Sequence, residues 1–179
     1  MGREKWVVLA AFLGGILLAN LLDRQILVTY GILNDYFLSR YTYQSIDRNR
    51  LFCYVFMERC KAAFLIFLLG RAVPRRAFPG LLQGIVAAGF GFLITVAIFN
   101  LGVTGIVICL AGLLPQWLFY MAAMAIYIDD RRQILPGGSK RELPAHLLHT
   151  LLTVFLLMLG ILTEGYINPV LLGYILKIF

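Results

Sequence analysis

Glu164 is the residue whose surroundings most strongly suggest chemistry, because this acid stands near the end of a long apolar stretch. A carboxylate among apolar residues is unfavourable unless it is paired or hydrated. Two basic residues, Arg59 and Lys61, interrupt another apolar stretch. We therefore expect Glu164 to pair with Arg59 or Lys61 and to fix the contact between two helices. The alternative is a proton or cation relay through Glu164.

His146 and His149 form a second group that could do chemistry. They are three residues apart, so on a helix they share one face and could offer two nitrogen ligands to a metal ion. The only carboxylate near them in the sequence that suits such a site is Glu142. We therefore interpret both histidines as residues of a membrane interface and predict no metal site.

Enzymatic motifs are missing from the sequence. The serines, Ser39, Ser45 and Ser139, all lie outside the apolar stretches, and neither a GxSxG nor an HExxH motif occurs. Cys53 and Cys60 are two helical turns apart and cannot form a disulfide within one helix. We predict a non-enzymatic protein without catalytic residues or cofactors.

The composition explains what must surround these groups. Of the 179 residues, 61% are hydrophobic and only 14% are charged. A soluble fold of this size could not bury so much apolar surface, so the lipid bilayer must cover part of it. The net charge of +7 comes mainly from residues beside apolar segments, where they meet lipid headgroups, and we expect no nucleic-acid partner.

The apolar segments predict an all-α membrane bundle of about five transmembrane helices in a single domain, 1–179. An amphipathic segment with helical periodicity follows the first span and is expected on the outer membrane surface, against the protein's own helices, or as a docking site for a partner. A C-terminal tail follows the last span. The expected spans are 6–22, 51–73, 79–99, 102–128 and 147–167, the amphipathic segment is 24–41, and the tail is 169–179.

Small and helix-breaking residues predict how these spans pack and bend. Gly80 and Gly84 are four residues apart and favour close helix packing. Pro115, followed by the polar Gln116, predicts a kink or a break near Leu114; a break would line a substrate path. Asn168 is expected to cap a new helix that has Pro169 at its first position, after a bend.

Basic residues orient the predicted spans. Residues 129–146, which begin with Asp129 and Asp130, are predicted to form a polar loop. Nine of the 16 Lys and Arg residues lie in the N-terminus, 71–76 and this loop, against five in 23–50 and the tail. The excess of positive charge marks the cytoplasmic side. We therefore expect the N-terminus inside the cell and the C-terminus outside.

Two segments resemble a known family, the stage II sporulation protein M family. Segment 112–120, centred on Pro115, resembles the fourth helix of that family, and segment 160–169 resembles its final helix, in which a Glu precedes a Pro. Many members carry His-Gly after the proline and an acid three residues later, where this chain has Gln116, Trp117 and Tyr120.

This resemblance implies a multi-pass protein of the bacterial cell membrane that acts in endospore engulfment. It implies a membrane scaffold for two peptidoglycan-degrading partners, an amidase-endopeptidase and a lytic transglycosylase. A homo-oligomer is compatible with this role. The alternative is the membrane subunit of a permease or ABC-type exporter, which the expected break at Pro115 and the glycines of span 79–99 would favour.

Overall fold

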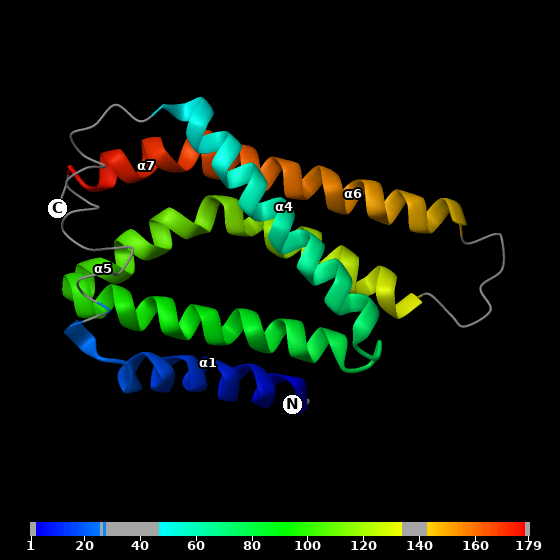
Figure 1. Ribbon diagram of the computed structural model, residues 1–179, viewed down its shortest axis with the longest axis horizontal. Helices are drawn as coiled ribbons and strands as arrows, with labels where there is room; N and C mark the ends of the chain where they lie inside the picture. The colour runs from blue at the N-terminus through cyan, green and yellow to red at the C-terminus, as the bar shows by residue number, and fades with distance from the viewer. Residues whose placement is uncertain (1–2, 26, 28–46, 134–142, 178–179) are drawn as a thin grey trace. The chain divides into compact units, whose positions relative to one another are not determined.

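Helices form the regular structure of the computed structural model, which describes residues 3–25, 27, 47–133 and 143–177 (Figure 1). The expected all-α class is confirmed for these residues, which contain no strand. The amphipathic segment expected over 24–41 lies, apart from residues 24, 25 and 27, outside the described residues. Two compact units make up the chain: Met1–Ile46 with Gly80–Gly112 and Leu171–Phe179, and Asp47–Pro79 with Leu113–Val170.

In the first unit, helix α1 (Arg3–Leu21) packs against the N-terminal part of α5 (Phe78–Gln133). A Cβ atom on Gly15 would overlap the backbone carbonyl of Ala88, and one on Gly91 would overlap the carbonyl of Phe12. The two backbones therefore touch directly, which only glycine permits at these positions. Gly84 belongs to the same contact, since its Cβ position lies 3.8 Å from the Ala11 Cβ.

Gly102 divides α5 into two helical limbs. Its backbone has φ 60° and ψ −144°, the one set of non-helical dihedral angles inside α5. Gly105 then contacts the backbone carbonyl of Ala97, eight residues earlier. In a straight helix, two residues eight positions apart would be separated by about 12 Å along the axis. The chain thus reverses at Gly102, where the sequence predicts a turn between two spans, because glycine adopts a positive φ without steric strain.

The second unit contains α4 (Arg48–Ala72), residues 78–79 and 113–133 of α5, and α6 (Leu143–Leu162). The Asp47 side chain caps α4 by accepting hydrogen bonds from the backbone N–H groups of Asn49 and Arg50. The Phe78 ring is fully buried and meets Tyr127 edge-on, at a centroid distance of 5.8 Å.

Three expectations about local structure need correction. Of the kink or break expected near Leu114, the break does not occur, because the chain stays helical at Pro115. The polar loop expected over 129–146 is shorter, because α5 continues to Gln133 and α6 begins at Leu143. Asn168 is no N-cap: its φ of −58° and ψ of −43° are helical, whereas a capping residue has an extended backbone. A π-helical turn, η2 (Thr163–Ile167), instead leads directly into α7 (Asn168–Ile175).

Within the described part of the chain, two helical stretches are long and apolar enough to cross a membrane, Phe78–Asp130 and His146–Ile175. Lys5–Leu21 is apolar but shorter. Helix α4 carries Glu58, Arg59 and Lys61 near its middle, which lowers its hydropathy. Length and composition are thus compatible with a membrane location.

Adjacent glycines of α1 provide a test of the packing in the first unit. Gly15→Ala should destabilise the protein in mild detergent, because the new methyl group must push α1 away from the Ala88 carbonyl. Gly14→Ala is the matched control, since no atom lies within 4 Å of its Cβ position. Alanine is better than glycine in a helix by about 1 kcal/mol, so this control should be as stable as the parent or more so. Equal melting temperatures for both variants would contradict the contact.

Candidate functional site

Glu164 lies in the π-helical turn η2, where the chain is wider than an α-helix. The backbone N–H of Asn168 bonds to the carbonyl of Thr163, five residues back, and the next residue is Pro169. Proline has no N–H to donate and clashes with the preceding turn of an α-helix. The π-turn accommodates Pro169 without ending the helix, and single π-turns of this kind are frequent at functional sites.

The Glu164 carboxylate accepts hydrogen bonds from two other helices. Arg59 of α4 donates from Nε to Oε2 at 2.7 Å and from Nη2 to Oε1, a bidentate ion pair. Tyr120 of α5 donates its hydroxyl to Oε2, also at 2.7 Å. The Arg59 guanidinium in turn lies 5.4 Å from the centre of the Tyr120 ring. These three residues are called the Glu164 network below.

Small residues make room for this network. A Cβ atom on Gly160 would overlap the Tyr120 ring, so that ring lies directly against the α6 backbone. Gly165 has a similar role, because its Cβ position lies 3.2 Å from the Phe52 ring. Phe52 also contacts the ring of Tyr166, at a centroid distance of 5.4 Å. The glycines around Glu164 thus bring α4 and α5 close enough for their side chains to reach it.

Of the two partners expected for Glu164, the structure shows Arg59 and not Lys61. Lys61 pairs with Glu58 on its own helix, at 2.7 Å, and both of these side chains are exposed. Arg59 projects from the opposite side of α4, because two residues correspond to about 200° around a helix. The Glu164 side chain is only 15% exposed, so it depends on this partner.

The geometry favours a structural tie over a proton relay. Both carboxylate oxygens receive donors from partly buried side chains of two other helices. A bidentate Arg–carboxylate pair is among the strongest and most directional side-chain contacts. Proton transfer by Glu164 would require all of these hydrogen bonds to break together. A structural role, in which Glu164 connects α4, α5 and η2, needs all of them to stay formed.

A second polar cluster joins α5 to α6. The Asp130 side chain is 9% exposed and contacts Nδ1 of His146 at 2.7 Å and Nδ1 of His149 at 3.3 Å. Among the described residues, no group of three or more His, Cys, Asp or Glu residues could hold a metal ion. The cluster instead bridges the ends of two helices. His146 is 18 residues from Glu164 along one helical run, about 27 Å, so the two clusters cannot form one catalytic site.

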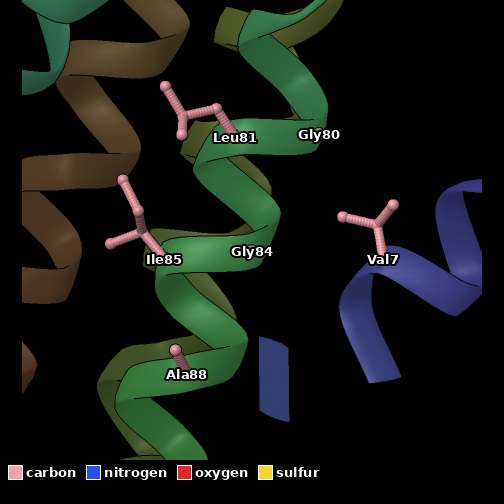
Figure 2. A pocket seen from close by; sticks show the side chains of 6 residues that line it. All are labelled: Val7, Gly80, Leu81, Gly84, Ile85 and Ala88. Carbon is pink, nitrogen blue, oxygen red and sulfur yellow. The ribbon is translucent and has the colours of Figure 1, made fainter. Parts of the chain in front are cut away.

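Two of the predicted glycines lie in the first unit. The close helix packing expected at Gly80 is not observed among the described residues, because no atom lies within 4 Å of its Cβ position. Gly80 and Gly84 line a shallow apolar pocket opposite Val7, while Leu81 and Ile85 point away from Val7 (Figure 2). Its lining has no polar side chain to orient a solute.

Three further predicted residues have identifiable surroundings. Gln116 follows Pro115 inside α5 and is 2% exposed. Asn168 and Pro169 lie one turn beyond Glu164, and the buried side-chain oxygen of Asn168 has no hydrogen-bond partner among the residues that the structure describes.

Sequence reasoning missed two members of these clusters. Tyr120 attracted notice only as a residue that replaces an acid in the family pattern. Asp130 was assigned to a loop because it belongs to a run of charged residues. The apolar helix before each residue was a usable signal, since a polar group that ends or interrupts such a helix needs a partner. Comparisons with family models, curated proteins and solved structures find no match for this chain.

The Glu164 network predicts a graded loss of stability. Tyr120→Phe should lower the free energy of unfolding in detergent by about 1.5 kcal/mol, the contribution of a hydrogen bond to a charged group. Arg59→Ala should have a larger effect and lower the free energy of unfolding by about 3 kcal/mol relative to the parent, because Glu164 is then left unpaired. The matched control is Tyr174→Phe, which changes a tyrosine that is 67% exposed.

Exchange of the charges separates pairing from relay. Arg59→Glu combined with Glu164→Arg should be more stable than either reversal alone, because the pair is restored. A double variant no more stable than the single variants would contradict a structural pair, as would a Tyr120→Phe variant that melts with the Tyr174→Phe control.

Proposed function

We propose that this chain is a non-enzymatic, multi-pass membrane scaffold. In this arrangement 6–22, 51–73, 79–99, 102–128 and 147–167 cross the bilayer. The N-terminus is cytoplasmic and the C-terminus is outside. The Glu164 network, which joins α4, α5 and η2 through both carboxylate oxygens, is the observation that carries the proposal. It provides a rigid set of helices on which partners can be held.

The geometry of α5 supports more than one crossing in this stretch. A straight helix of 53 residues would extend about 80 Å, far beyond the ~30 Å hydrocarbon layer. The reversal at Gly102 divides Phe78–Asp130 into two limbs, each long enough for one span. The charged middle of α4 is accommodated in part by the pairing of Arg59 with Glu164.

The resemblance to the stage II sporulation protein M family supplies the cellular role in this proposal. The scaffold would hold membrane-anchored peptidoglycan hydrolases during endospore engulfment. The exporter alternative was supported by the glycines of span 79–99 and by a broken helix at Pro115. That residue lies in continuous helix, so the argument for a substrate-lining break no longer applies.

The proposed topology can be mapped with a membrane-impermeant thiol reagent. In a chain from which Cys53, Cys60 and Cys109 have been removed, Gly2→Cys and Gly138→Cys should not react in intact cells. They should react once the membrane is opened. A single cysteine at 46 should react in intact cells, because it lies outside. Reagent access to position 138 in intact cells, with none to 46, would invert the orientation. Reaction at all three sites in intact cells would contradict membrane crossing.

The scaffold role predicts which proteins co-purify with the full chain. Mild detergent extraction of the tagged protein from sporulating cells should recover an amidase-endopeptidase and a lytic transglycosylase, identified by mass spectrometry. Destabilising Arg59→Ala should reduce this recovery, and Tyr174→Phe should not. Recovery of an ATP-binding subunit, or solute flux through liposomes containing the pure protein, would instead support an exporter.

A further inference from the structure

Helix α4 presents an exposed face with a seven-residue periodicity. Tyr54, Lys61 and Leu68 recur every seven residues, and Met57 and Phe64 fall between them. The apolar members of this set are 45–66% exposed. This spacing places all five side chains along one seam, as in the contact surface of a coiled coil.

An ion pair lies in the middle of this face. Glu58 and Lys61 contact each other at 2.7 Å, and their side chains are 47% and 64% exposed. Apolar residues continue on both sides, over 51–57 and 62–70. If α4 crosses the bilayer as proposed, this pair therefore stands within the hydrocarbon layer and not among the headgroups.

Contact with lipid hydrocarbon is unfavourable for such an ion pair. Charged side chains within a membrane almost always face protein or water. The inward side of α4 is already occupied, since Arg59 there binds Glu164 and Val55 is buried. The outward seam is consequently best covered by a protein surface that is polar at the level of Glu58 and Lys61 and apolar above and below them.

We propose that a second copy of this chain covers the α4 seam, so that the protein forms a two-fold dimer in the membrane. This inference rests on the membrane placement of α4 in the proposed function. Two copies inserted in the same orientation are related by an axis along the membrane normal, so their α4 helices run parallel and equal residue numbers meet. Glu58 and Lys61 differ in level by about 4.5 Å, within reach of long side chains.

The charge pattern of the seam is self-complementary. Glu58 of each copy faces Lys61 of the other, which gives a neutral group of four charges enclosed by apolar residues. Above and below it, Tyr54, Met57, Phe64 and Leu68 pack against their counterparts. A partner of other sequence would have to reproduce both the charges and the spacing, whereas a second copy has them by symmetry.

Disulfide trapping in native membranes tests this dimer with the full chain. In a background with Cys53, Cys60 and Cys109 changed to Ala, Met57→Cys should yield a cross-linked dimer on mild oxidation. Leu151→Cys is the matched control, because it places a thiol on an exposed apolar position of α6, Leu151 being 59% exposed. It should remain monomeric.

Charge exchange between chains tests the role of the ion pair. In the Met57→Cys background, Glu58→Lys and Lys61→Glu should each reduce the cross-linked fraction about tenfold, equivalent to about 1.4 kcal/mol of association free energy. Differently tagged copies of the two variants, expressed together, should cross-link with each other again. A pair that acts only within its own helix would show no such rescue between chains.

The outcomes separate the dimer from the proposed function. If the chain resists alkaline extraction from membranes but Met57→Cys yields no dimer, the dimer proposal is overturned and the membrane arrangement stands. The same holds if Met57→Cys cross-links to another segment of its own chain or to a different protein. If the chain is extracted as a soluble protein, the membrane arrangement itself fails. Equal cross-linking of Met57→Cys and Leu151→Cys would also overturn the dimer.

Discussion

Much of the second unit depends on the need to pair a carboxylate that sits within an apolar helix. Glu164 is mostly buried, and an unpaired charge in such surroundings is strongly unfavourable. Its partners come from two other helices, so pairing the charge also fixes how these helices meet. Arg59 provides the opposite charge and Tyr120 completes the coordination of Oε2.

Backbone geometry and small residues make this pairing possible. The π-turn at Thr163–Ile167 keeps the helix continuous up to Pro169. Gly160 and Gly165 remove the side chains that would hold Tyr120 and Phe52 away from α6 and η2. The first unit uses glycine in the same manner, at Gly15 and Gly91, where backbones touch. In the proposed membrane arrangement, close backbone contact and polar ties would take the place of the hydrophobic drive that stabilises a water-soluble core.

Three neighbouring charged residues of helix α4 have two different roles. Arg59 faces inward and binds Glu164, whereas Glu58 and Lys61 face outward and bind each other. The apolar residues of α4 would be ambiguous without these charges, since both faces are rich in large hydrophobic side chains. The inward charge joins the helix to its own chain. In the proposed dimer, the outward pair lies on the surface of α4 that a second copy covers.

The sequence by itself determined the features that depend on local chemistry. Helical class, the turn at Gly102 and the need of Glu164 for a basic partner all follow from residue types and their spacing. Helix formation is local, and glycine acts through its own missing side chain, so a short window of sequence suffices.

Only the tertiary structure decided which residues meet. Arg59 and Glu164 are 105 residues apart, and the choice of Arg59 over Lys61 depends on how α4 is rotated about its axis. Tyr120 and Asp130 found their partners in the same way, through the packing of separate helices. Asn168, expected to cap a helix, lies inside a helical run because the π-turn before it adapts to Pro169. Such outcomes depend on the free energy of the packed whole, which local patterns do not contain.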